Sequence, residues 1–183
     1  MELKAHLTTA WELTLEFVAS LVILTLVMFG LWLLSFGLLA PVTLAGYTRS
    51  LLRIVREGRD PKIQDLFADM GKFLPLLLLA AIMVLAVAIG VSLVILPGIL
   101  ILFLITFAFL YVLPLMVDKD LAVVPAIRES VSMAMRRPLT HQLIVTAIYL
   151  LLISIGSSVF IGLLFTQPLA TLFLLSVYNR RVQ

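Results

Sequence analysis

The feature that most constrains this chain is the distribution of its charged side chains. All thirteen Lys and Arg and all ten Asp and Glu lie in four short clusters. Three stretches between the clusters carry no charge: Phe17–Thr48, Phe73–Val117 and Pro138–Asn179. A charged side chain at the centre of a bilayer costs about 2.5–3.5 kcal/mol on insertion scales, so such stretches are typical of chain within hydrocarbon. We therefore predict an all-α integral membrane protein.

Composition bounds the rest of the molecule. Apolar residues make up 63% of the chain and charged residues only 13%, whereas a soluble domain is roughly 45–50% apolar. We expect a single membrane domain over residues 1–183, with no large soluble part. The absence of cysteine excludes disulfides and thiolate chemistry. The net charge of +3 comes from residues that flank apolar stretches, where basic residues determine topology, so we expect no nucleic-acid partner.

The number of crossings follows from the lengths of the stretches. One crossing needs about 20 apolar residues, so the 45- and 42-residue stretches should hold two helices each. Their expected turns are Leu96-Pro97-Gly98 and Thr166-Gln167-Pro168. The 32-residue stretch is long for one helix and short for two, with a break at Ser35-Phe36-Gly37. We favour six transmembrane helices as three hairpins; five crossings are the alternative.

A weak internal repeat supports six crossings. A proline lies near the expected start of each second helix, where its missing N–H breaks no bond: Pro41, Pro97 and Pro168. Each hairpin also follows a short amphipathic segment expected at the membrane interface. The segments cover about residues 2–11, 61–72 and 122–137, and the hairpins about 12–55, 73–117 and 139–180. Short apolar patterns also recur by chance, which leaves coincidence as the other interpretation.

The basic residues predict the orientation. No Lys or Arg lies at the three expected turns, which include Gly37, Pro41, Pro97, Gly98 and Pro168. Cytoplasmic loops are enriched in Lys and Arg. Both termini and both charged loops are therefore expected in the cytoplasm.

A stripe of arginines is the main candidate binding site. Arg49, Arg53 and Arg56 are spaced i, i+4, i+7, which places them on one helix face. Each can contribute about 1 kcal/mol of attraction near an anionic membrane surface. We favour topology anchoring as the role of the stripe and of Arg136 and Arg137. The functional alternative is a site for anionic lipid or an anionic partner.

The segment at 61–72 has the pattern of an interfacial helix. Its apolar residues are spaced i, i+3, i+4, i+7: Ile63, Leu66, Phe67 and Met70. Asp65 and Asp69 are then expected on the opposite, polar face, with the helix in the plane of the interface. Such a helix can sense lipid packing or dock a partner, or simply surround the bundle as a collar.

Small residues indicate where helices approach closely. One set with a spacing of four is Ser154, Ser158 and Gly162, and a second is Ala86 and Gly90. The spacing is compatible with contacts within one chain or between copies in a homo-oligomer.

Short motifs resemble the YciC-like family of bacterial inner-membrane proteins and the membrane domain attached to some glycerophosphodiester phosphodiesterases. The resemblance rests on Arg56-Glu57-Gly58 with Asp65-Leu66-Phe67, on Leu96-Pro97-Gly98-Ile99, and on Ala126-Ile127-Arg128-Glu129-Ser130. It covers about residues 41–135. It implies a multi-helix protein of the bacterial inner membrane without an assigned activity, and it supplies no catalytic residues.

These patterns narrow the function classes. The apolar stretches lack the ionisable residues that ion-coupled transport usually needs. No catalytic or metal-binding pattern occurs, so we expect no cofactor and no enzyme activity. Our first hypothesis is a scaffold or lipid-interacting membrane protein. The alternative is a passive channel or transporter for an uncharged or lipid-like solute.

Overall fold

The fold is that of a computed structural model, which describes residues 2–92, 95–136, 139–157 and 160–182. All regular structure in these ranges is helical, which confirms the predicted all-α class. The α-helices are α1 Glu2–Glu16, α2 Val18–Leu34, α3 Ala40–Glu57, α4 Phe73–Ser92, α5 Ile95–Phe109, α6 Val112–Asp118, α7 Val123–Met135, α8 Leu139–Ser157 and α9 Phe160–Val182. Two short 3₁₀ helices, η1 Ile63–Phe67 and η2 Met70–Lys72, lie between α3 and α4.

The first hairpin, α2–α3, turns at the residues of the expected break. Phe36 and Gly37 have positive φ angles of 49° and 81°, a backbone region that glycine adopts without steric cost. Pro41 lies at the start of α3. Gly58 closes the other end of α3 with a φ of 61°, and its N–H donates to the oxygen of Ile54 at 3.0 Å.

In the other two hairpins, the residues expected at the turns lie inside helices. Helix α4 ends at Ser92 and α5 begins at Ile95, so Pro97 and Gly98 lie in the first turn of α5. The turn expected at Thr166-Gln167-Pro168 is wrong by a larger margin, because α9 begins at Phe160 and continues through Pro168. Proline inside a membrane helix is tolerated when neighbouring groups satisfy the freed backbone carbonyl. Gln167 is therefore a helical residue within α9.

Four segments are long and apolar enough to cross a membrane: Ile63–Ala88, Ile99–Asp118, Leu139–Gly156 and Gly162–Val182. Helices α1 and α2 add a fifth if the pair, bent by 85°, is counted as one broken span. Helix α3 is not among the candidates. Its C-terminal half carries the arginine stripe, which lowers its hydropathy. The structure thus shows four to five candidate spans, and the predicted six are not confirmed.

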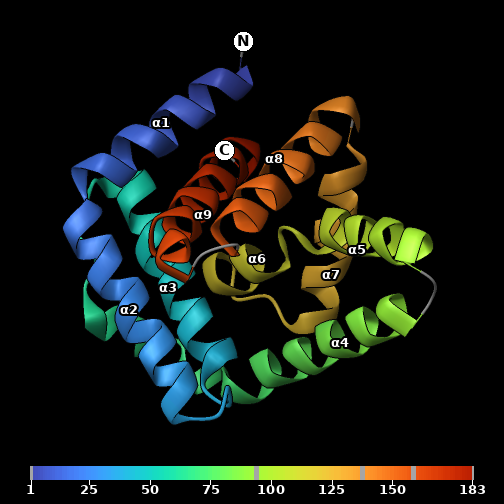
Figure 1. Ribbon diagram of the computed structural model, residues 1–183, viewed down its shortest axis with the longest axis horizontal. Helices are drawn as coiled ribbons and strands as arrows, with labels where there is room; N and C mark the ends of the chain where they lie inside the picture. The colour runs from blue at the N-terminus through green and yellow to red at the C-terminus, as the bar shows by residue number, and fades with distance from the viewer. Residues whose placement is uncertain (1, 93–94, 137–138, 158–159, 183) are drawn as a thin grey trace.

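Helices α3 and α9 form the centre of the bundle. Helix α9 contacts α8, α1, α3 and α2, and α3 also packs on η1, α6 and α4. Half of the α9 span is buried, compared with 11% of Ile63–Ala88. Figure 1 shows the reason: the α4–α5 hairpin extends outward, with its connected ends away from the other helices.

Candidate functional site

Charged side chains from three parts of the chain meet where α3 ends. We call this group the charged layer: Arg49, Arg53, Arg56, Arg59, Asp65, Asp69, Lys72, Asp118 and Asp120. The arginines come from α3 and the residues just after it. The acidic residues come from the collar (residues 61–72) and from the end of α6. The tertiary fold is needed to bring these segments together.

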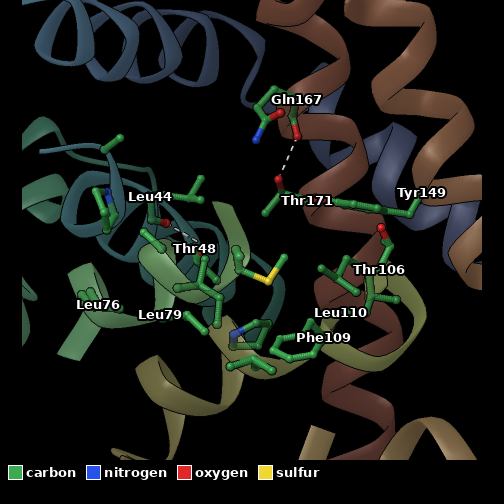
Figure 2. Close-up of a pocket in the computed structure, with 18 of the residues that line it drawn as sticks. Leu44, Thr48, Leu76, Leu79, Thr106, Phe109, Leu110, Tyr149, Gln167 and Thr171 are labelled. Atoms are coloured by element: carbon green, nitrogen blue, oxygen red, sulfur yellow. Dashed lines mark hydrogen bonds between the residues drawn. The ribbon is translucent and has the colours of Figure 1, made fainter. Parts of the chain in front are cut away.

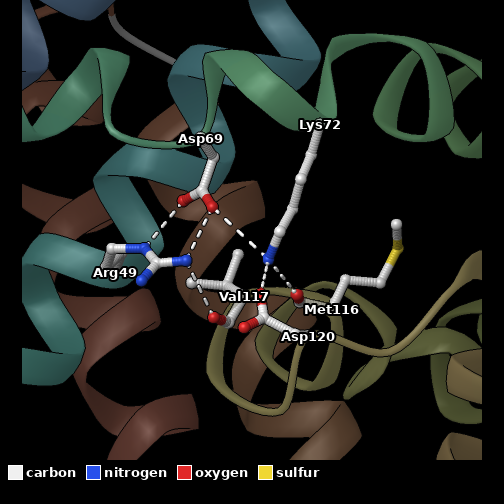
Figure 3. A network of polar contacts seen from close by, with 6 residues as sticks. All are labelled: Arg49, Asp69, Lys72, Met116, Val117 and Asp120. Carbon is white, nitrogen blue, oxygen red and sulfur yellow. Dashed lines mark hydrogen bonds and ion pairs between the residues drawn. The ribbon is translucent and has the colours of Figure 1, made fainter.

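Arg49 joins α3 to both other parts of the layer. Its Nε and Nη2 donate to the two carboxylate oxygens of Asp69 at 2.8 and 2.6 Å (Figure 3). Its Nη2 also donates to the main-chain oxygen of Val117 at 3.0 Å. Asp69 is only 2% exposed. A two-point contact of this kind fixes the orientation of the guanidinium as well as neutralising its charge.

Lys72 makes a second connection at the same place. Its Nζ donates to the main-chain oxygen of Met116 at 3.0 Å and lies 3.6 Å from Asp69. It also pairs with Asp120 (Figure 3). The hydrogen bond from Lys72 lowers the pKa of Asp120 below its ordinary value. These contacts connect η2, just before α4, to the end of α6 and the loop after it.

Asp65 accepts hydrogen bonds from several donors around the collar. It accepts from Ser50 Oγ at 2.9 Å and from Arg53 at 3.2 Å, and it pairs with Arg59. The main-chain N–H of Lys62 also donates to it, at 3.3 Å. One carboxylate therefore holds the start of the collar against α3.

Arg56 makes the third connection, to the end of α6. Its Nη1 and Nη2 donate to the two carboxylate oxygens of Asp118 at 2.5 and 2.9 Å. Its Nε donates to the side-chain oxygen of Asn179 at 2.9 Å, and Tyr178 donates to Asp118 at 2.9 Å. Helices α3, α6 and α9 are thus joined by one group of polar contacts.

The collar turns the opposite face toward the bundle from the one that its spacing predicted. It forms two 3₁₀ helices instead of one α-helix, and Asp65 and Asp69 point inward and are buried. Among the four apolar positions only Leu66 is buried; Ile63, Phe67 and Met70 are at least 39% exposed. The aspartates can be buried here because each meets an arginine, and a buried charge requires such a partner.

The arginines of the stripe are therefore already paired with acidic residues. Arg49, Arg53 and Arg56 each contact an aspartate of the same chain. Arg136 pairs with Glu129 at 3.2 Å on the surface, and Arg137 lies outside the described residues. Binding of anionic lipid at these arginines stays a prediction. A phosphate there would have to share them with the carboxylates.

The small residues have different places from those that their spacing suggested. Ser154 is exposed on α8, and Ser158 and the surroundings of Gly90 lie outside the described part of the chain. Ala86 is half-buried on α4. Gly162 belongs to α9, not to α8, and a Cβ on it would come within 3.1 Å of the main-chain oxygen of Gly156. Gly162 and Gly156 thus permit the close approach of α8 and α9.

Sequence reasoning missed Gly46. A Cβ at this position in α3 would overlap the main-chain carbonyl groups of Asp65 and Leu66. The glycine lets the collar approach α3 closely enough for its aspartates to reach the arginines. The available signal was a glycine in the middle of a helical segment, since such residues often have a packing reason.

A cavity of about 460 Å³ opens between the α4–α5 hairpin and the rest of the bundle. Its walls come from α2, α3, α4, α5, α6, α8 and α9. Apolar side chains such as Leu44, Leu76, Leu79 and Met83 form most of its lining. None of the lining residues is charged. Its size is within the range of about 300–1,000 Å³ that is typical of small-molecule sites.

Most polar side chains of the cavity lie on one side, whereas Thr48 lies with the leucines on the other. Figure 2 shows Gln167 and Thr171 of α9, Tyr149 of α8 and Thr106 of α5 together, with Leu44, Leu76 and Leu79 opposite. Thr171 and Thr106 each donate at 2.8 Å to a carbonyl of their own helix. Thr48, which lies one residue before Arg49, places the cavity next to the charged layer.

The charged layer and the cavity offer different groups to a ligand. Within the described ranges, no three His, Asp or Glu side chains are close enough together to hold a metal ion. The layer's carboxylates are occupied by arginine and lysine. The cavity offers apolar surface and neutral hydrogen-bonding groups.

Comparison of the chain with protein-family models, with curated proteins and with solved structures finds no match.

Proposed function

We propose that this chain is a non-enzymatic, lipid-interacting protein of the bacterial cytoplasmic membrane that holds a lipid-like molecule beside its α4–α5 hairpin. The observation that carries the proposal is the apolar, uncharged cavity of about 460 Å³ at the level of the candidate spans. Apolar pockets with a few convergent polar groups are the usual form of a ligand site. The YciC-like resemblance is compatible with this role and belongs to the same proposal.

The proposed topology has six crossings, with both termini in the cytoplasm. Helix α3 has 18 residues, which at 1.5 Å per residue gives about 27 Å, close to the roughly 30 Å of the hydrocarbon core. It is enclosed by α2, α4, α6 and α9, so lipid does not have to surround it. Its arginines lie at one end and are neutralised. These properties support α3 as an interior crossing, in a monomer or in a homo-oligomer.

Two alanines of α4 provide a matched test of lipid binding. Ala80 lines the cavity, whereas its neighbour Ala81 is exposed on the outside of the helix. We expect Ala80→Phe to fill part of the cavity and to lower the amount of lipid that copurifies with the protein in mild detergent. Ala81→Phe adds the same side chain outside the cavity and should leave that amount unchanged.

Native mass spectrometry or lipid extraction measures the copurifying lipid, and thermal unfolding checks that both variants fold. Equal lipid retention in Ala80→Phe, Ala81→Phe and the parent chain would contradict the proposal.

A second candidate is a passive pathway for an uncharged solute. The observation in its favour is that the cavity lies where helices are interrupted or contain proline: Pro41, Pro114 and Gln167, the last next to Pro168, line it. Release of an uncharged dye or sugar from proteoliposomes would support this function. We would expect Ala80→Phe to slow such release and Ala81→Phe to leave it unchanged.

A further inference from the structure

The cavity has two chemically different sides, and together they define a class of ligand. One side is mostly apolar, with Leu44, Leu76 and Leu79, and the Thr48 hydroxyl there donates to the main-chain oxygen of Leu44 at 2.8 Å. The other carries the hydroxyl of Tyr149 and the side-chain amide of Gln167 (Figure 2). An occupant that satisfies both sides is amphiphilic, with a small polar group at one end of an apolar body.

The polar side lies within the candidate spans. Tyr149 belongs to the span Leu139–Gly156 and Gln167 to Gly162–Val182. Thr106 of Ile99–Asp118 stands beside them. Ionised groups at such a depth are costly and require a charged partner. Since no lining residue is charged, the polar group of the occupant has to be neutral.

The nearest cations do not change this conclusion. Arg49 is the closest in sequence, one residue after the lining residue Thr48, but both its Nε and its Nη2 donate to Asp69. Lys72 is held by Asp120 and by the main-chain oxygen of Met116. A phosphate in the cavity would have to displace these contacts, whereas a neutral head would not.

The hydrogen-bonding groups further restrict the head. Within the part of the chain that the structure describes, the Tyr149 hydroxyl and the Gln167 side-chain amide have no protein partner, and the contact of Gln167 with Thr171 uses its main-chain oxygen. The amide offers both a donor and an acceptor, and so does the tyrosine hydroxyl. A free hydroxyl group on the ligand also donates and accepts, so it is matched to either group. Thr106 and Thr171 use their protons within their own helices and can only accept.

We propose that the cavity binds an uncharged lipid with a free hydroxyl group, of the diacylglycerol class, with that hydroxyl between Tyr149 and Gln167. The inference rests on the proposed function, because it names the ligand class of the same cavity. It assigns the apolar body of the lipid to the side formed by Leu44, Leu76 and Leu79. The charged layer then marks the end of the cavity without taking part in binding.

Photocrosslinking in vesicles tests the ligand class. The protein is reconstituted in phosphatidylcholine vesicles that contain a trace of a diazirine-labelled probe. The two probes, dioleoylglycerol and dioleoylphosphatidic acid, differ only in a hydroxyl or a phosphate at one glycerol position. We expect the diacylglycerol probe to label cavity peptides of α4 and α9 more strongly, and Ala80→Phe to remove that labelling.

Two near-isosteric variants test the assigned contacts. Tyr149→Phe removes one hydroxyl and Gln167→Met removes the amide, and each should lower diacylglycerol labelling about two- to tenfold. Labelling by the phosphatidic acid probe should not change. Gln64→Met, at an exposed position of η1, is the control for the glutamine substitution. Thermal unfolding identifies any variant that fails to fold. In that case the labelling of the other variant tests the inference.

The outcomes separate this inference from the proposed function. If phosphatidic acid labels the cavity as strongly as diacylglycerol, or if both variants retain full labelling, the inference is wrong while lipid binding stands. If neither probe labels cavity residues, the proposed function itself fails.

Discussion

Asp69 and Asp65 are buried, although both lie in a segment whose neighbouring side chains Phe67 and Ile63 are exposed. This arrangement is reasonable only because arginines of α3 lie directly beneath the carboxylates. Breaking a buried ion pair leaves an unpaired buried charge, which costs about 3–5 kcal/mol. The single carboxylates of the collar are therefore expected to contribute strongly to stability.

We predict that Asp69→Asn destabilises the protein by about 3 kcal/mol, the lower end of that range, because Arg49 keeps 28% side-chain exposure. Equilibrium unfolding in mixed detergent and SDS micelles measures the change. Glu129→Gln is the control, since it removes the surface partner of Arg136 and should cost about 0–1 kcal/mol. Equal effects of the two variants would show that the Arg49–Asp69 pair contributes no more to stability than a surface ion pair.

Two helical glycines give a second prediction at this scale. A Cβ added at Gly30 meets no atom within 4 Å, so Gly30→Ala should stabilise α2 by up to about 1 kcal/mol through helix propensity. Gly46→Ala would overlap the main chain of the collar and should destabilise by about 1–3 kcal/mol. Thermal unfolding of the two variants should show shifts of opposite sign; shifts of the same sign would contradict the close contact at Gly46.

At the scale of elements, local patterns located segments better than they described how those segments pack. The turn at Phe36 and Gly37 follows from a glycine between two apolar runs. Pro168 has a similar sequence context to Pro41, yet it lies inside a helix. The two cases differ in tertiary surroundings, which decide whether a helix continues through a proline. The spacing at 61–72 located the collar, but not the face that turns inward.

The link between η2 and the loop after α6 gives a pH prediction. Lys72 holds the pKa of Asp120 below its ordinary value of 3.8. A carboxylate with a lowered folded-state pKa stabilises the protein above its unfolded-state pKa, and this contribution is lost as the pH falls through the folded-state value. The stability difference between the parent chain and Asp120→Asn should thus be constant near neutral pH and shrink in the acid range below 3.8.

Thermal unfolding between neutral and acid pH measures this difference, which should be small because the Asp120 side chain is 77% exposed. In a Lys72→Gln background it should nearly vanish, as a double-mutant cycle requires. A difference that persists without Lys72 would show that the Lys72–Asp120 pair is not its cause.

At the scale of the whole molecule, the topology can be tested with single cysteines, since the chain has none of its own. Phe36 is fully exposed in the first turn, and Phe36→Cys avoids the strain expected at Gly37, whose φ is 81°. We predict labelling of Phe36→Cys by an impermeant maleimide from the outer side only. Glu57→Cys, at the exposed end of α3, should be labelled from the cytoplasmic side only.

Gln167→Cys separates the observed third hairpin from the one expected from sequence. Within α9 it should resist the impermeant reagent from both sides, whereas a residue in an outer turn would react. Labelling of Phe36→Cys from the cytoplasm would rule out α2–α3 as a pair of crossings.

The sequence alone indicated the membrane class and determined the helical content and the regions of the helices, because charge exclusion and apolar length are local properties of the chain. The tertiary structure alone decided three further features: the arginines meet carboxylates of the same chain, the collar turns its acidic face inward, and a cavity opens beside α4–α5. Each depends on contacts between residues far apart in sequence. An arginine stripe looks the same in sequence whether its partner is a lipid phosphate or an aspartate, and only packing distinguishes the two.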